Sequence, residues 1–303
     1  MIRFTEIKNG LITTLLFIIL VISLLIPPLS MITVWLFPLP FFVAAAQRGW
    51  GTTVFPAILC CFFVLLVTGH PFFLMAVLFS AVTGAVMGSI YRQKDSTGTD
   101  VILGGLVTTW VCFLLIAAVA HWSGVLAQAE SVAREQWKLT EEMFRSAGME
   151  GSMPDVEALK MVIPGVMMMF TLPFPFLNLV LGRRWLLKKE LPGKYLPPFR
   201  KWRLPRSFFY FYFIILVAML FSDNLFPSAP LIFGNATTIL YFLFFLQGLS
   251  FIAFLLHHYH RGKGWFILTI VMSFLLPFVT VLIHFAGILD TGTELRNRIQ
   301  NKS

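Results

Sequence analysis

Long apolar stretches separated by short polar breaks run through most of the chain and predict a series of membrane-spanning helices. Nine stretches can be marked, at residues 10–29, 31–47, 52–69, 71–91, 101–121, 160–182, 207–224, 232–256 and 265–288. Several run for 18 or more residues without a charge, which is the length a helix needs to cross a bilayer core about 30 Å thick. We therefore expect an all-α polytopic membrane protein with about nine transmembrane helices.

Composition agrees with this pattern and excludes a soluble protein. Hydrophobic residues make up 58% of the 303 residues and charged residues only 12%, whereas soluble domains carry about 25% charged residues. The three cysteines lie inside apolar stretches, so we expect them to pack as small apolar side chains rather than to form a disulfide framework.

The placement of Lys and Arg predicts the orientation of the chain, because basic residues are retained on the cytoplasmic side. With the N-terminus in the cytoplasm, 16 of the 23 basic residues fall on the cytoplasmic side. Nine crossings would then place the C-terminal tail on the outer side. The net charge of +9 is explained by this asymmetry, and no nucleic-acid partner is expected.

The breaks divide the chain into three parts. Residues 1–182 hold six predicted spans, 183–206 form a basic cytoplasmic loop, and 207–303 hold three further spans and a short tail. Within the first part, the extracytoplasmic segment 122–159 repeats apolar residues every three or four positions and predicts an amphipathic helix. Glu130 with Arg134, and Glu141 with Arg145, stand four residues apart and support that helix. It is either a lid over an outward-facing cavity or a helix resting on the membrane interface.

The loop 183–206 is the most basic part of the chain and is interleaved with aromatic residues. We expect it to lie against anionic lipid headgroups, which attract each nearby base by about 1 kcal/mol. A docking site for a cytoplasmic or membrane protein partner is the alternative. The basic residues singled out for either role are Arg183, Arg184, Lys188, Lys189, Arg200, Lys201, Arg203 and Arg206.

Catalytic motifs are missing from the sequence. It contains no HExxH, GxxxxGK[ST] or GxSxG pattern, and no Cys/His set with metal-ligand spacing stands out. The cluster His257, His258 and His260 lies beside Arg261 and Lys263, whose charges disfavour a bound cation. We therefore expect a protein without intrinsic catalysis, metal or cofactor.

Polar residues inside the apolar stretches are the better candidates for binding, since each is costly in hydrocarbon. Asn178, Gln247 and His284 are the three that stand out, either as substrate-binding residues or as cross-links between helices. The run TLPFPF at Thr171–Phe176 is the most proline-broken stretch. A substrate pocket, if the protein has one, is expected there.

A ridge of small residues indicates close helix packing. Ser80, Gly84 and Gly88 recur at every fourth position of the span 71–91, which lets a neighbouring backbone approach closely. Packing inside the bundle is the first interpretation, and a homodimer face is the second.

The layout of the second to fourth spans resembles the YybS family of uncharacterised bacterial membrane proteins. The residues that carry this resemblance are WLFPLPFFVAAAQRGWGTTVFPAILCCFFVLLVTGHPFFLMAVLFSAVTGAVMGSIYRQK, from Trp35 to Lys94. That family looks distantly similar to the substrate-binding (S) subunits of energy-coupling-factor transporters, six-helix bundles that capture vitamins or metal ions. The resemblance implies a bacterial cell-membrane location and an outward-facing pocket in the first six helices. One departure is that Leu11–Ile26 contains no Ala or Gly, whereas those subunits dock through a small-residue strip on their first helix.

Two functions follow as expectations. The first is a small-solute-binding or transport-related membrane protein with a small-molecule ligand. The second is a scaffold or regulator that recruits a cytoplasmic partner through the basic loop. Asp223, next to the end of the stretch 207–224, is the one acidic residue within the nine predicted spans, and the interior of every span lacks Asp and Glu, which argues against autonomous proton- or sodium-coupled transport.

Overall fold

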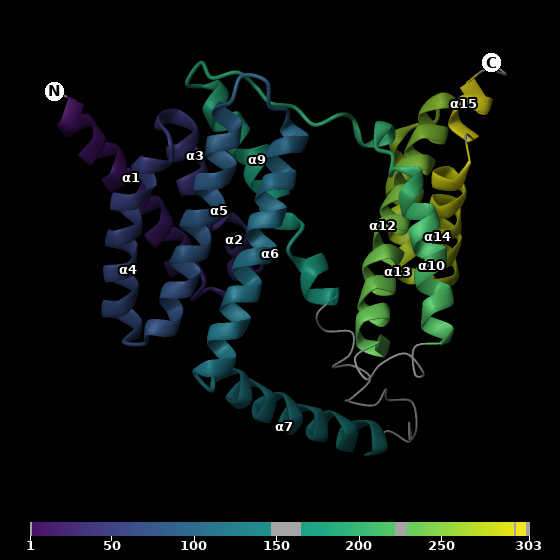
Figure 1. Cartoon of the computed structure of the whole chain (residues 1–303), viewed down its shortest axis with the longest axis horizontal. Helices are drawn as coiled ribbons and strands as arrows, with labels where there is room; N and C mark the ends of the chain where they lie inside the picture. Colours follow the sequence, from purple (N-terminus) through teal and green to yellow (C-terminus); the bar gives the residue numbers. More distant parts are fainter. Residues whose placement is uncertain (1, 147–164, 222–228, 294, 301–303) are drawn as a thin grey trace. The chain divides into compact units, whose positions relative to one another are not determined.

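The computed structural model describes residues 2–146, 165–221, 229–293 and 295–300, and over these residues it is built from helices and loops. The protein is an all-α polytopic membrane protein. Two compact units are present: unit 1 comprises 1–151 and 170–196, and unit 2 comprises 152–169 and 197–303. The boundary between them crosses the basic loop after Leu196. Each unit is described by itself (Figure 1).

Unit 1 is a bundle built mainly from the first six apolar stretches. Its α-helices are α1 (Ile2–Ser23), α2 (Pro27–Thr33), α3 (Leu39–Arg48), α4 (Val54–Thr68), α5 (Leu74–Arg92), α6 (Gly98–Trp122), α7 (Val125–Ser146) and α9 (Pro173–Leu187). Short 3-10 turns at Val34–Leu36, Trp50–Thr53 and Pro71–Phe73 connect them. Thr97 and Asp100 form a capping box that starts α6, which satisfies the free backbone N–H groups there.

The centre of unit 1 is the contact between α3 and α5, and the small-residue ridge lies in it. A Cβ atom on Gly84 would lie 2.6 Å from the carbonyl oxygen of Pro38, and one on Gly88 would lie 2.5 Å from the Cβ of Ala45. Ser80 is fully buried on the same helix. The ridge therefore packs inside the bundle, against α3, as the first interpretation expected.

Unit 2 holds the remaining helices: α10 (Arg206–Leu220), α12 (Ala229–His258), α13 (Lys263–Leu275), α14 (Pro277–Gly292) and α15 (Leu295–Gln300), with a 3-10 turn at Phe199–Lys201. Its core lies between α10, α12 and α14, where Tyr212, Ile215, Leu240, Phe244 and Ile288 are buried. The helices α12 and α14 approach most closely at two glycines. A Cβ on Gly248 would overlap the carbonyl of Ile283, and one on Gly287 would overlap that of Phe244.

The predicted span 265–288 is a bent pair of helices rather than one straight helix. The axes of α13 and α14 differ by 119° at a break at Leu276, whose backbone is extended with φ −124° and ψ 102°. Pro277 causes the break, because proline disfavours helical dihedrals in the residue before it and is itself well placed at a helix start. At about 1.5 Å per residue, the 13 residues of α13 are too short to cross a bilayer core.

The contacts of α14 show that it runs parallel to α12. His284 contacts Tyr241, and Gln247, six residues further along α12, bonds Asp290, six residues further along α14. Beyond α14, Arg296 donates to the carbonyl oxygen of Arg200 at 2.7 Å. The tail therefore lies at the same end of unit 2 as the loop 197–206. The expectation that nine crossings place the tail on the opposite side is wrong, because the last apolar stretch turns back on itself.

The nine predicted stretches coincide with apolar helices wherever they are described. Among the described residues, six helical segments are long and apolar enough to cross a membrane: Pro27–Arg48, Trp50–Thr68, Pro71–Arg92, Gly98–Trp122, Gly165–Leu187 and Ala229–His258. Ile7–Ser23 and Arg206–Leu220 are shorter apolar helices, and α13 with α14 completes the set. Residues 160–164 and 222–224 of the predicted spans, and 147–159 of the amphipathic segment, lie outside the described residues.

Candidate functional site

Unit 1 contains a cavity between the first part of α1, the last part of α3 and the end of α9. Its volume is about 780 Å³, within the range of about 300 to 1,000 Å³ that small-molecule sites usually have. The turn Trp50–Thr53 and the start of α4 close one side of it, through Gly51, Thr52 and Phe55. The sequence analysis did not predict a cavity at this position.

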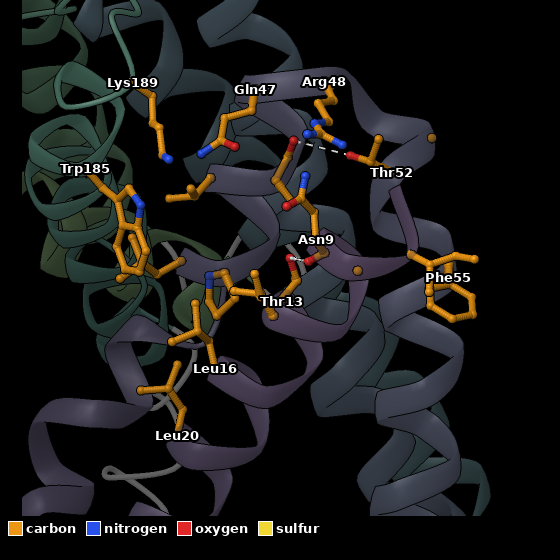
Figure 2. A pocket seen from close by; sticks show the side chains of 18 of the residues that line it. Asn9, Thr13, Leu16, Leu20, Gln47, Arg48, Thr52, Phe55, Trp185 and Lys189 are labelled. Carbon is orange, nitrogen blue, oxygen red and sulfur yellow. Dashed lines mark hydrogen bonds between the residues drawn. The ribbon is translucent and has the colours of Figure 1, made fainter. Parts of the chain in front are cut away.

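The lining of the cavity changes from apolar to polar along its length. Figure 2 shows Leu16 and Leu20 of α1 at one end, and Gln47, Arg48 and Lys189 near the other. The apolar end is formed by side chains from α1 and α3. The residues of this apolar wall are Leu16, Ile19, Leu20, Leu39, Pro40 and Val43.

The polar end results from where α3 stops. Gly49 has φ 101°, a left-handed conformation that only glycine adopts without strain, so α3 ends at Arg48. Thr52 then fastens the following turn, because its hydroxyl donates to the carbonyl oxygens of Gly49 at 2.8 Å and Ala44 at 3.2 Å. This turn holds Gln47 and Arg48 at the rim.

The charged residues that line the described cavity are both basic. Arg48 comes from α3 and Lys189 follows the end of α9, while Asn9, Gln47 and Thr52 supply neutral polar groups. Cationic side chains at one end and a hydrocarbon wall at the other suit a molecule with an anionic head and an apolar body. No acid or nucleophile with a neighbouring base is among these lining residues.

Asn178 does not line this cavity. Its side chain is fully buried in α9, and its Nδ2 donates to the carbonyl oxygens of Trp35 at 2.8 Å and Phe174 at 2.5 Å. Its Oδ1 has no hydrogen-bond partner among the described residues. The amide therefore joins α9 to the turn that precedes α3, and its role in substrate binding stays a prediction.

The proline-broken run at Thr171–Phe176, where a pocket was expected, is filled with aromatic side chains. The ring of Phe174 lies 4.9 Å from that of Trp35 and 5.0 Å from that of Phe79, between centroids. Trp110 donates its indole N–H to Thr171 Oγ1 at 2.6 Å. The cavity described above does not include this run and lies at the end of unit 1 where α1 begins and α3 and α9 end.

Gln247 and His284 both lie in unit 2, but in separate groups of contacts. His284 bonds the hydroxyl of Tyr212 at 3.2 Å and the carbonyl oxygen of Tyr241 at 3.1 Å, and its ring stacks on Tyr241 with centroids 4.1 Å apart. It is 4% exposed. The imidazole thus connects α14 to α10 and α12.

Gln247 belongs to a buried polar cluster that the sequence did not reveal. Its Oε1 accepts from the backbone N–H of Leu204 at 3.0 Å, and its Nε2 donates to Asp290. Arg296 completes the cluster, with Nε 2.9 Å from Asp290 Oδ1 and Nη2 2.6 Å from Oδ2. Asp290 is 1% exposed and Arg296 is 4% exposed.

The basic loop is held to the protein at two places rather than lying free. In unit 1, Tyr91 donates to the carbonyl oxygen of Pro192 at 2.7 Å. The buried Lys194 ammonium donates to the carbonyl oxygens of Gln93 and Ser96. Burial lowers the pKa of Lys194 from its ordinary value. In unit 2, the loop is held by a clasp, which is the hydrogen bond from the Arg296 guanidinium to the carbonyl oxygen of Arg200.

The eight basic residues singled out in this loop differ in exposure. Arg183 and Arg200 are partly buried, and the guanidinium of Arg183 lies 4.3 Å above the ring of Tyr195. The other six are exposed: Arg184, Lys188, Lys189, Lys201, Arg203 and Arg206. Lys189 is the member of the set that lines the cavity.

The comparison with known families now adds to this geometry. The family described as predicted membrane protein (DUF2232) matches residues 12–291 of the chain. The chain belongs to the DUF2232 family. This DUF2232 protein is also similar to the uncharacterized protein YybS of Bacillus subtilis (strain 168), at 23% identity over 309 aligned residues that cover 97% of each chain.

These findings confirm the resemblance to the YybS family that rests on Trp35–Lys94. No solved structure matches this DUF2232 protein. Similarity to the S subunits of energy-coupling-factor transporters therefore stays a prediction.

Proposed function

We propose that this DUF2232 protein is a non-catalytic membrane protein of the bacterial cell membrane that binds a small amphiphilic molecule with an anionic head group. The binding site is the unit 1 cavity. The observation that carries this proposal is the separation of polar and apolar groups within one cavity, which has the basic residues Arg48 and Lys189 near one end and apolar side chains at the other.

The expected orientation of the chain indicates from which side of the membrane the ligand enters. The positive-inside rule predicts that the start of α1 and the end of α9 lie in the cytoplasm. The cavity then accepts its ligand from the cytoplasmic leaflet or the cytosol. This differs from the outward-facing capture that the S-subunit resemblance implies, so the cavity supports a binding function of another kind.

A matched pair of lipids tests the proposal on the full-length protein in phosphatidylcholine nanodiscs. Oleoyl lysophosphatidic acid carries an anionic head, and monoolein has the same acyl chain with a neutral head. We expect a saturable rise in the thermal midpoint with the first lipid and none with the second. At about 100 times Kd, ligand linkage stabilises the folded state by about 2.7 kcal/mol.

Variants assign the effect to the cavity. The double substitution Arg48→Gln with Lys189→Gln removes both rim charges, and the lysophosphatidic acid shift should fall at least tenfold in potency. The control Arg184→Gln with Lys188→Gln removes two exposed charges outside the cavity lining and should keep the shift. Equal shifts with both lipids, or equal loss in both double variants, would overturn the proposal.

Recruitment of a cytoplasmic partner through the basic loop is the second candidate function. Within unit 2, the exposed bases Lys201, Arg203 and Arg206 stand on the part of the loop whose backbone Arg296 fastens at Arg200, and they offer a cationic surface to such a partner. The two functions are separable, because Lys201, Arg203 and Arg206 lie outside the cavity lining.

A further inference from the structure

The helix α7 leaves the unit 1 bundle directly after a membrane span. The span α6 ends at Trp122, which is 86% exposed, and α7 begins at Val125 after a turn at Gly124 with φ 76°. Figure 1 shows α7 lying across the end of α6 rather than continuing it. Two residues of linker hold the start of α7 at the depth where the span ends.

One face of α7 is apolar and is not covered by other described parts of unit 1. Its large exposed side chains are Leu126 (47%), Val132 (57%), Leu139 (49%), Met143 (70%) and Phe144 (37%). At about 100° per residue, these five side chains fall within a single arc of about 140°. A helix in water would expose this face at a considerable free-energy cost.

The opposite face carries every charged residue of the helix. Two ion pairs lie along it, Arg134 with Glu130 at 3.0 Å and Arg145 with Glu141 at 2.8 Å, which confirms the pairs expected from the sequence. Between Val125 and Ser146 there are four acidic and three basic residues. Attraction to anionic lipids therefore does not hold this helix, and burial of the apolar face must do so.

The apolar face of α7 continues the lipid-facing surface of α6. Near its end, α6 exposes Leu114 (65%) and Leu115 (61%), residues that meet hydrocarbon in a membrane span. A span ends at the headgroup layer, and the interfacial aromatic Trp122 marks that depth. A helix that starts there, with its own apolar face exposed, is in reach of the acyl boundary without any further partner.

We propose that α7 lies in the headgroup layer of the leaflet at the C-terminal end of α6, with its apolar face inserted among the acyl chains of zwitterionic lipid. Interfacial helices of this kind bury their apolar face about 5–10 Å deep. The charged face, with its two ion pairs, stays in water. Of the two roles expected for segment 122–159, this one does not require a cavity beneath the helix, and it is independent of the ligand proposed above.

Fluorescent labels on adjacent residues test this placement in the full-length protein. NBD is attached to single cysteines at Leu139 and Met143 on the apolar face, and at Lys138 and Glu142 on the charged face, in a background with Cys60, Cys61 and Cys112 changed to Ala. The proteins are placed in phosphatidylcholine nanodiscs. Each sample is quenched with aqueous iodide or with phosphatidylcholine that carries a doxyl group near the head.

We expect labels at 139 and 143 to emit at shorter wavelength, to be quenched by the doxyl lipid, and to show several-fold smaller iodide quenching than labels at 138 and 142. Equal iodide quenching at all four positions would place α7 in water. Protection at 139 and 143 from both quenchers would place that face against protein. Either result would overturn the proposal.

A second pair of variants tests the same placement without a label at residues 138, 139, 142 or 143, in case labelling there disturbs the helix. The double substitution Leu139→Glu with Met143→Glu should expose a label at Val132 to iodide. The control Lys138→Ala with Glu142→Ala changes the neighbouring positions on the charged face and should leave that label protected. Equal protection in the two variants would also overturn the proposal.

Discussion

At the scale of single residues, the pair Asp290 and Arg296 determines how the end of the chain is held. Both side chains are almost completely buried, and the guanidinium donates to the Asp290 carboxylate, to the carbonyl oxygen of Arg200 and to Ser250 Oγ. Such a pair adds little stability compared with apolar residues, but removing one partner leaves a buried charge without compensation.

The substitution Arg296→Gln should therefore destabilise unit 2 by about 3–5 kcal/mol. The double substitution Asp290→Asn with Arg296→Gln should recover part of that loss, because no isolated charge then remains. Arg298→Gln is the matched control, since Arg298 is exposed on the same short helix. Chemical unfolding of the protein in detergent measures the differences. Equal stability of the variants at 296 and 298 would contradict the proposed clasp.

Sequence patterns could locate part of this cluster. Gln247 stands out as a polar residue in an apolar stretch, whereas Asp290 lies just beyond the marked end of the last stretch, where a polar residue is expected. Its spacing of six residues from Arg296 matches no helical pair. The fold-back of α15 on α14, which creates the pair, depends on tertiary contacts and leaves no local pattern.

At the scale of helices, the close approaches of α3 to α5 and of α12 to α14 differ in how well the sequence pattern predicts them. The ridge on α5 repeats every fourth position in one helix, so its spacing predicted a packing face. Gly248 and Gly287 stand alone on two different helices, α12 and α14. Their meeting depends on the bend at Leu276, and a one-dimensional pattern does not contain it.

Alanine substitutions along α12 should separate the two kinds of glycine. At Gly248 the added Cβ meets the backbone of Ile283, and overpacking of this kind costs about 1–3 kcal/mol. At Gly234 nothing lies within 4 Å of the added Cβ, so Gly234→Ala should raise helix stability by up to about 1 kcal/mol. Thermal unfolding of the two variants gives the comparison. A Gly248→Ala variant as stable as Gly234→Ala would refute the close packing of α12 on α14.

At the scale of the whole molecule, the bent pair changes the charge balance between the two sides of the membrane. With α15 at the end of unit 2 that holds the loop 197–206, Arg296 and Arg298 join the 16 basic residues of the expected cytoplasmic side. That side then has 18 of the 23 basic residues. The corrected topology follows the positive-inside rule more closely than the odd number of crossings did.

Cysteine labelling on cells tests this topology. In a background without native cysteines, Lys201→Cys and Arg298→Cys should both resist a membrane-impermeant maleimide on intact cells, and both should react after permeabilisation. Ser131→Cys on α7 should react in intact cells. Reaction of Arg298→Cys alone with that reagent on intact cells would restore a ninth crossing. Reaction of both Lys201→Cys and Arg298→Cys would instead reverse the orientation expected from the charges.

The helical class, the apolar stretches and most helix bounds could be predicted, because the bilayer imposes length and apolarity on each span locally. The cavity could not. Arg48 and Lys189 lie at helix ends and Asn9 just precedes the first marked apolar stretch, places where polar residues are expected for solvation alone. Their convergence depends on how α1, α3 and α9 pack, which no single stretch specifies.

The division of the chain into units also has a consequence for the order of events during synthesis. Unit 1 takes its last helix, α9, from beyond a stretch that belongs to unit 2. Its first 151 residues therefore leave the ribosome without the helix that carries Asn178, Trp185 and the buried face against α3. At about 5–20 residues per second, several seconds pass before that helix is made. During this time the earlier helices of unit 1 lack the contact between α3 and α9.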